Sequence, residues 1–258
     1  MKIKILHKIR NKEPNFGNLE NIDKIIEYKS HDIYKIIEYI KNNLKDKDEE
    51  IELYALGPNS ILVSTTYILS KLGYKFKLIP KPTDSEQWGW LEDNNSNIEF
   101  KSKAKYIGKK MLIENSGKAC IVLSGKHNID IKSNQVYMSN DQIVINKDID
   151  SNGLNVVTLS HKLTLDENNY RSLATQSGFF KFQIEIEKIL LELSNINNLK
   201  EIHIISSIPA IGLLHLGELI SKFDTDKNIK FFIYNYLEND TYQLGNILHK
   251  SIIKEKKL

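Results

Sequence analysis

The stretch that decides the fold is Glu201–Tyr236, EIHIISSIPAIGLLHLGELISKFDTDKNIKFFIYNY. It opens with a short, β-branched apolar run, Ile202–Ile205, which is typical of a buried strand. Pro209 follows, and proline is favoured in the first turn of a helix because the N–H it lacks has no partner there. Leucine and isoleucine then recur at helical spacing as far as Phe223, and a second apolar run, Ile229–Tyr234, follows a polar turn. The stretch therefore predicts a β-α-β unit, in which ligands bind beyond the carboxyl ends of the strands.

The same unit occurs a second time, 151 residues earlier in the chain. Ile51–Pro58 and Ile202–Pro209 each run from an isoleucine through an apolar strand to a proline. The same offset relates the amphipathic segment Lys181–Asn195 to Ser30–Leu44, which also reads as a helix with Ser30 as its N-cap. Identity between the copies is slight, so the repeat is one of structure. We predict an α/β fold of two Rossmann-like halves fused into one pseudo-symmetric body, with a pocket where their strand-end loops meet.

The remaining segments allow coarser predictions. Lys2–Ile9 alternates apolar and basic residues and is expected to form an edge strand, whereas Ile22–Tyr28 fits either a strand or a helical turn. Ile129–Asp150 is expected to be a meander or a helix with a hairpin, and the tail Glu238–Leu258 a further helix. The predicted organisation is an N-terminal segment with the first helix at 1–50, packed on the first half, then the first half at 51–150 and the second half at 151–258.

The composition is that of an ordinary globular protein. The 258 residues are 41% hydrophobic and 27% charged, and the net charge of +3 is too small for a dedicated duplex-DNA binder. Cys120 is the single cysteine, so one chain can hold neither a disulfide nor a cysteine-based metal site, and its apolar surroundings favour burial. No apolar run is long enough to span a bilayer and the N-terminus lacks the apolar core of a signal peptide, so we expect a cytoplasmic protein.

Sequence motifs of common enzymes are absent, including the phosphate-binding glycine patterns, HExxH and GxSxG. Four short loops of small, polar or basic residues remain, each placed after a predicted strand: Gly57–Ser60, Ser124–His127, Ser160–Lys162 and Ser206–Pro209. The first and last open helices, whose free N–H groups favour an anion such as phosphate. The middle two add lysine charges. For each loop taken alone, a plain turn is the alternative.

Three further residues have both a functional and a structural interpretation. Trp88 and Trp90 can stack on a nucleobase or serve as core anchors, and Arg171 can clamp a phosphate or lie solvated at the surface. His203, inside a strand, is interpreted as a core histidine. The candidate ligand-binding residues are Gly57, Pro58, Asn59, Ser60, Trp88, Trp90, Ser124, Lys126, His127, His161, Lys162, Arg171, Ser206, Ser207, Pro209 and Tyr234.

The order and spacing of several short motifs resemble one family, the SAVED domains. The motifs that resemble the end of a SAVED domain are a strand beginning at His203, then Pro209, the Leu216-Gly217 pair, a strand ending near Tyr234, and a second tyrosine, Tyr242. The Gly57-Pro58 loop, the Trp88-Gly89-Trp90 segment and the run CIVLSGKHNID at Cys120–Asp130 also fit. The resemblance covers roughly Ile51–Leu248.

This resemblance implies both a fold and a function. SAVED domains resemble two fused CARF-like Rossmann units, and they sense cyclic oligonucleotide second messengers in the anti-phage CBASS and type III CRISPR systems. They are usually fused to an effector that is switched on when the ligand promotes oligomerisation. The implied protein is a non-catalytic sensor of a cyclic tri- or tetra-adenylate-like ligand that needs no cofactor or metal and associates with further copies of itself.

The chain departs from the family pattern because only about 50 residues precede Ile51, too few for a known effector. The effector is therefore expected to be a separate polypeptide, unless the chain is an excised part. Two alternatives stay open. One is a ring nuclease that degrades the messenger with His127, His161 and Lys162 as acid, base or charge stabiliser. The other is a scaffold subunit with a vestigial pocket.

Overall fold

The computed structural model describes residues 1–7, 19, 21–28, 32–82, 87–92, 117–125, 129, 136–139, 142–145, 160–164, 173–224, 228–237 and 241–254. Its elements are β1 Lys2–His7, β2 Lys24–Tyr28, α1 Ile33–Asn43, β3 Ile51–Leu56, α2 Asn59–Lys71, β4 Phe76–Leu78, β5 Lys118–Ser124, β6 Val136–Ser139, β7 Gln142–Ile145, β8 Ser160–Thr164, α4 Gln176–Ser194, β9 Glu201–Ser206, α5 Ala210–Phe223, β10 Lys230–Tyr236, β11 Thr241–Leu248 and α6 Ser251–Lys254.

The two sheets of the molecule share one strand order. The smaller sheet runs β2-β1-β3-β4 with all neighbours parallel. The larger sheet contains β8-β5-β9-β10, again all parallel, and β11, β7 and β6 extend it with antiparallel pairs. Because β3-α2-β4 and β9-α5-β10 are the two predicted copies of the β-α-β unit, β1 corresponds to β5 and β2 to β8. The fold is therefore two fused Rossmann-like halves, as predicted.

Sheet membership differs from the prediction at two places. β1 lies between β2 and β3, so it is an interior strand and not the edge strand expected from its alternating pattern. β5, within the segment 51–150 assigned to the first half, pairs with β9 from Lys118 to Leu123 and so belongs to the larger sheet. The physical reason is that an apolar run predicts a strand but not its partner, which lies far away in sequence.

The helix cap near the N-terminus and the secondary structure of the C-terminal tail differ from the prediction. Asp32, and not Ser30, caps α1, because its Oδ1 accepts a hydrogen bond of 2.9 Å from Tyr34 N. The expected tail helix is instead strand β11 followed by the short helix α6. Pairing with β10 supplies the backbone hydrogen bonds of β11, and a glycine in the segment, Gly245, disfavours a helix. The ambiguous segment at 22–28 contains strand β2, and the 129–150 segment contains the hairpin β6–β7.

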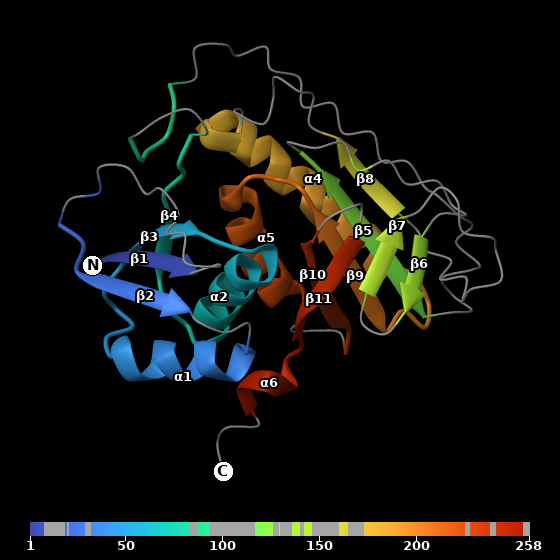
Figure 1. The fold of residues 1–258 in the computed structure, drawn as a ribbon, viewed down its shortest axis with the longest axis horizontal. Coiled ribbons are helices and arrows are strands. Elements are labelled where there is room, and N and C mark those ends of the chain that lie inside the picture. The colour runs from blue at the N-terminus through green and yellow to red at the C-terminus, as the bar shows by residue number, and fades with distance from the viewer. Residues whose placement is uncertain are drawn as a thin grey trace.

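Helices α2 and α5 lie between the two sheets and join the halves (Figure 1). Thr66 Oγ1 of α2 donates a hydrogen bond of 2.6 Å to the carbonyl oxygen of Leu214 in α5. Conversely, a Cβ at Gly217 of α5 would overlap the carbonyl oxygen of Val63 in α2. Since Leu214 and Gly217 are the counterparts of Val63 and Thr66 at the offset of 151, the contact is reciprocal, as at a two-fold interface. The helices therefore meet across a pseudo-two-fold axis.

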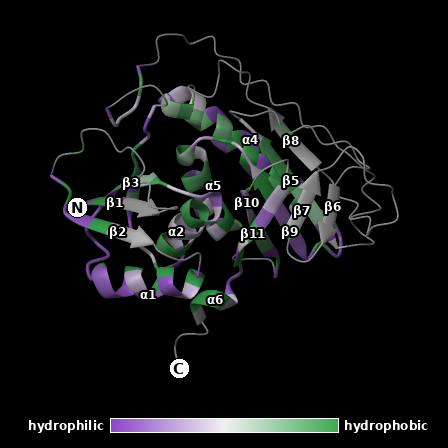
Figure 2. Cartoon of the chain, viewed as in Figure 1, coloured by the Kyte–Doolittle hydropathy of each residue, from purple (hydrophilic) through white to green (hydrophobic). Residues whose placement is uncertain are grey.

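The hydrophobic core is continuous across this seam. One cluster of buried side chains includes Ile3 of β1, Ile61 of α2, Ile121 of β5 and Leu216 of α5. Hydrophobic residues colour most of α5 and β5 in Figure 2, whereas α1 presents a hydrophilic outer side. Cys120 is fully buried, which confirms its interpretation as a small core residue, and burial raises its pKa to about 12.

The described residues contain neither a helix suited to a membrane nor a cluster suited to a metal ion. None of the helices in these ranges combines the length and the apolarity that crossing a bilayer requires. Among the same residues, no three His, Cys, Asp or Glu side chains are grouped so that they could hold a metal ion.

Candidate ligand-binding site

Two equivalent loops, one from each half, start the seam helices. Pro58 is the N-cap of α2 and Pro209 that of α5, with nearly equal φ of −60° and −58°. Proline has no side chain that can accept a hydrogen bond from the first helical N–H groups, and neither cap makes one. The predicted loops Gly57–Ser60 and Ser206–Pro209 therefore occupy the positions that the repeat assigns to them.

The start of α2 is bound to the strand ends of the second half. Asn59 Nδ2 donates to the carbonyl oxygens of Ser206 at 2.8 Å and Tyr234 at 3.3 Å. Ser60 N donates to Asn235 Oδ1 at 2.9 Å, and Asn235 Nδ2 returns a bond of 2.9 Å to Ser60 Oγ. The side-chain amide of Asn235, from the other half, therefore supplies the capping hydrogen bond that Pro58 cannot make. The α2 start is thus partly satisfied by protein, whereas the N-cap residue of α5, Pro209, gives its helix no side-chain hydrogen bond.

The loops after β5 and β9 approach each other closely. Gly125 N donates to Ser207 Oγ at 2.9 Å, and Ser207 N donates to the carbonyl oxygen of Leu123 at 2.9 Å. A Cβ at Gly125 would lie 2.8 Å from Ile208 Cα, so only glycine allows this approach. Ser124 is buried, and its hydroxyl accepts from Ile129 N at 3.1 Å. The carboxyl ends of these strands are therefore held together, as predicted for a shared sheet edge.

The aromatic candidates occupy three separate places. The ring of Tyr234 is buried, and its hydroxyl lies 3.0 Å from His203 Nδ1, so it reaches the α2 start only through its carbonyl oxygen. Trp88 meets Tyr54 edge-on at 5.3 Å between centroids, and Trp90 meets Phe179 at 5.2 Å. Trp90 also packs against the main core. The two tryptophans therefore do not share one stacking surface.

The basic candidates are only partly described. Ser160, His161 and Lys162 were predicted as a loop after a strand, but they begin β8, so that prediction is wrong. His161 pairs with Ile121 and Lys162 with Val122, both in the middle of β5 and before the carboxyl ends of the strands. An apolar run just before these residues had suggested that the strand ended there. Three candidates lie outside the described residues, namely Lys126, His127 and Arg171.

Two residues at the seam were missed from the sequence. Asn235 follows the predicted strand and caps α2, and Asn246 of β11 donates to Ser64 Oγ at 2.9 Å. A side-chain amide directly after a parallel strand is a usable signal for Asn235, because strand ends carry the functional loops. No local signal marks Asn246, since its segment was assigned to a helix.

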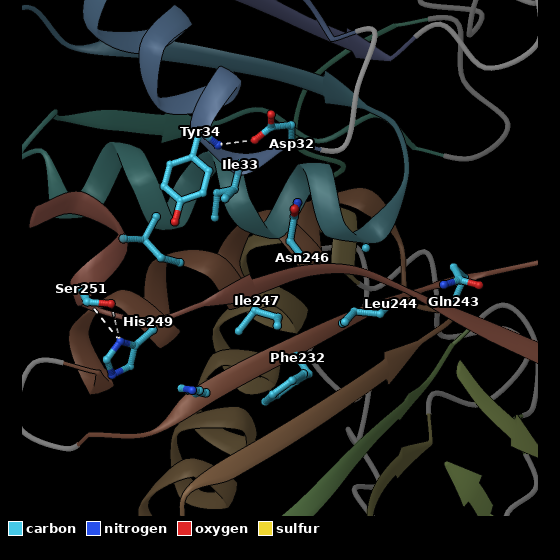
Figure 3. A pocket seen from close by; sticks show the side chains of 13 residues that line it. Asp32, Ile33, Tyr34, Phe232, Gln243, Leu244, Asn246, Ile247, His249 and Ser251 are labelled. Atoms are coloured by element: carbon cyan, nitrogen blue, oxygen red, sulfur yellow. Dashed lines mark hydrogen bonds between the residues drawn. The ribbon is translucent and has the colours of Figure 1, made fainter. Parts of the chain in front are cut away.

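A further cavity of about 680 Å³ lies between α1 and the β10–β11 hairpin and extends from Gln243 of β11 to His249 (Figure 3). Its main polar side chains are engaged with the protein itself. Asp32 caps α1, and the ring nitrogens of His249 lie 2.8 Å from Ser251 Oγ and 2.8 Å from Asn228 Oδ1. None of the predicted ligand-binding residues is among the described residues that line this cavity.

One known protein family has a model that matches this amino-acid sequence. The family model of the SAVED domain, described as the SMODS-associated and fused to various effectors sensor domain, matches residues 33–244. The chain belongs to the SAVED family. The match covers both β-α-β units and the seam between them, so the fused halves described above are those of a SAVED domain.

Solved structures of similar fold are SAVED/CARF-domain receptors. The Acinetobacter baumannii Cap4 receptor with the cyclic trinucleotide 2'3'3'-cAAA matches at 9% identity with a TM-score of 0.51. The same receptor with 3'3'3'-cAAA matches at 10% identity with a TM-score of 0.51. Both matches cover 84% of this chain and 42% of the receptor, so this SAVED chain spans less than half of the receptor's length. No curated protein matches the sequence.

Proposed function

We propose that this SAVED protein is a non-catalytic sensor that binds a cyclic oligonucleotide, of the cyclic tri- or tetra-adenylate type, across its pseudo-two-fold seam. The observation that carries the proposal is that a chain of the SAVED sensor family brings two equivalent strand-end loops together at one seam. The Cap4 receptors of the same fold, solved with cyclic trinucleotides, support this ligand class.

The start of α5 is the favoured place for a phosphate. Backbone N–H groups at a helix start attract anions, and no hydrogen bond like the one from Asn235 to α2 is found at the start of α5 among the described residues. Ser207 lies two residues before Pro209, the N-cap of α5. Lys126 and Lys162 are proposed to offset the remaining phosphate charge, with Trp88 or Trp90 covering a base. No cofactor or metal takes part in this proposal.

Binding is proposed to favour an assembled state that activates a separately encoded effector in anti-phage defence. For such a switch to work, the ligand must bind the assembled state more tightly than the free chain. The bound ring would complete a surface for another copy of the chain or for an effector subunit.

The test is thermal unfolding of the purified protein against a panel of cyclic di-, tri- and tetranucleotides, with size-exclusion chromatography of each hit. Ligand at 100 times its dissociation constant adds about 2.7 kcal/mol of stability, which is visible as a melting shift. Stabilisation by one ring size with a gain in apparent mass is the expected result. No stabilisation by any ring would reject the sensor and favour the scaffold alternative.

Two controls sharpen this test. Changing Lys126 and Lys162 to Gln should weaken binding and flatten its salt dependence, whereas changing Lys188 and Lys200, which are exposed and belong to α4 and the segment before β9, should not. Chromatography of the ligand after prolonged incubation checks for turnover. Recovery of the intact ring is expected, and its loss would identify a ring nuclease.

A further inference from the structure

The internal symmetry of the molecule is broken at one edge. Ile51 pairs with Phe76 of β4, and its counterpart Ile202 pairs with Phe231 of β10, so Phe76 and Phe231 are equivalent. Phe231 is also paired on its other side, with Leu248 of the antiparallel strand β11. β4 has no such neighbour in the part of the chain that the structure describes, because it ends the smaller sheet. Among the described residues, no strand takes the place beside β4 that β11 takes beside β10.

Backbone groups of β4 point toward this position. Ile51 N donates to the carbonyl oxygen of Lys75 at 3.0 Å, and Ile79 N donates to Leu53 at 3.2 Å, so Lys75 and Ile79 face β3. Successive residues of a strand direct their N–H and C=O groups to alternate sides. Phe76 and Leu78 therefore present theirs to the side away from β3, where an added strand would bind.

In the second half, β11 shows what such a strand does. It lies against α2, where Asn246 Nδ2 donates to Ser64 Oγ at 2.9 Å. A Cβ at Gly245 would overlap the side chain of Ser60, so the backbone of β11 approaches α2 closely. The strand therefore extends the sheet and satisfies a hydroxyl on the helix that crosses beneath it.

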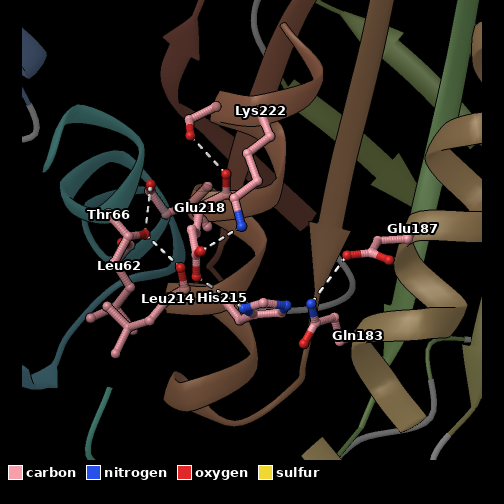
Figure 4. Close-up of polar contacts among 10 residues, drawn as sticks. Leu62, Thr66, Gln183, Glu187, Leu214, His215, Glu218 and Lys222 are labelled. Atoms are coloured by element: carbon pink, nitrogen blue, oxygen red, sulfur yellow. Dashed lines mark hydrogen bonds and ion pairs between the residues drawn. The ribbon is translucent and has the colours of Figure 1, made fainter. Parts of the chain in front are cut away.

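The counterpart of Ser64 at the offset of 151 is His215 of α5, and it is unsatisfied. His215 is 3% exposed, and its Nδ1 lies 3.3 Å from Glu218 Oε2 (Figure 4). Hydrogen bonding from His215 and from Lys222 lowers the pKa of Glu218 to about 2, so this carboxylate is ionised. His215 Nε2 is buried, and no hydrogen-bond partner for it is found among the described residues.

A cleft of about 410 Å³ lies along β4. His215 lines it together with all three residues of β4, and aromatic rings form its walls. Phe180 on α4 is 60% exposed there, which is a large apolar surface for an isolated side chain. The cleft therefore offers a strand edge that no described strand pairs with, an apolar wall and a buried imidazole nitrogen without a described partner.

We propose that this cleft docks an extended segment of an effector protein, which joins β4 as a fifth, antiparallel strand and forms a side-chain hydrogen bond with His215 Nε2. Strand addition to a sheet edge draws affinity from backbone hydrogen bonds and specificity from side-chain pockets. The family is described as fused to various effectors, which places an effector close to the SAVED domain. We therefore take an effector as the partner.

The probe for this proposal is a fluorescein-labelled peptide with the sequence of β11, TYQLGNIL, because β11 fills the equivalent place in the other half. Fluorescence polarisation should detect saturable binding to the full chain. Hydrogen exchange followed by mass spectrometry should show slower exchange at Phe76–Leu78 when the peptide is present. Replacing the peptide's asparagine by alanine should weaken binding about five-fold, since it removes one buried hydrogen bond.

Two variants of α4 form a matched pair. Phe180→Ser removes the exposed wall of the cleft and should weaken peptide binding about ten-fold. Leu191→Ser changes an equally exposed residue, 63% against 60%, on the same helix but outside the cleft, and should leave binding within about two-fold. Equal effects of the two changes would overturn the proposal.

Three further results would contradict the proposal. One is the absence of saturable binding. Another is binding that leaves exchange at Phe76–Leu78 unchanged, which would place the peptide elsewhere. The third is self-association of the chain that the peptide abolishes, measured by analytical ultracentrifugation, which would assign the edge to a second copy instead of an effector.

Discussion

At the scale of single residues, His203 shows how a polar side chain is accommodated in the larger sheet. It is 1% exposed and stacks on Phe232, with ring centroids 4.6 Å apart. Its Nδ1 lies 3.0 Å from the hydroxyl of Tyr234, and its Nε2 lies 3.4 Å from Glu201 Oε2, which contacts Lys118 Nζ at 2.9 Å. The interpretation of His203 as a core histidine is confirmed.

This burial makes stability depend on pH. Burial lowers the pKa of His203 to about 4, whereas an unfolded histidine titrates near 6.5. As pH falls from about 6.5 to 4 the unfolded chain binds the proton first, so the free energy of unfolding decreases, by an amount on the order of 2–3 kcal/mol. Urea unfolding at pH 7, 6 and 5 measures this decrease. His203→Gln should flatten it, and parallel curves for the two proteins would contradict the assignment.

At the scale of elements, the contact between α2 and α5 depends on a helical glycine. A Cβ at Gly217 would overlap the carbonyl oxygen of Val63, which belongs to a helix backbone and cannot rotate away. Gly217→Ala should therefore cost about 1–3 kcal/mol, despite a helix-propensity gain of about 1 kcal/mol. The shift in the urea midpoint measures this cost.

Gly212, in the same helix, provides the control. A Cβ there would lie 2.9 Å from Ile208 Cδ1 and 3.3 Å from Leu173 Cδ1, which are the ends of flexible side chains. Gly212→Ala should therefore change stability by less than about 1 kcal/mol. If both alanine variants were equally stable, the close contact of the seam helices would be refuted.

At the scale of the whole molecule, the two halves share one core. Buried residues from β1, α2, β5 and α5 belong to a single cluster, and Thr66 bonds to Leu214 across the seam. Neither half can therefore unfold without exposing the core of the other. We expect one unfolding transition, with coincident curves from tryptophan fluorescence, which reports Trp88 and Trp90, and from far-UV circular dichroism. Two separate transitions would show that the halves fold independently.

For the candidate site, the sequence predicted where the helices start but not which side chains contact those starts. The prolines at 58 and 209 mark the helix starts because proline's fixed φ suits a first turn, and this signal is local. The amide of Asn235 that caps α2 comes from 175 residues away, and no spacing rule connects it to Ser60. The position of Lys162 was misjudged because the end of an apolar run was read as the end of a strand.

The sequence by itself determined the two β-α-β units, since hydrophobic periodicity and proline placement act within a few residues and the 151-residue offset repeats them. Only the tertiary structure decided that β5 joins the larger sheet, that α2 and α5 meet across a pseudo-two-fold axis, and that β4 and His215 line one cleft. The physical reason is that strand pairing and helix packing depend on residues distant in the chain, whose approach leaves no local pattern.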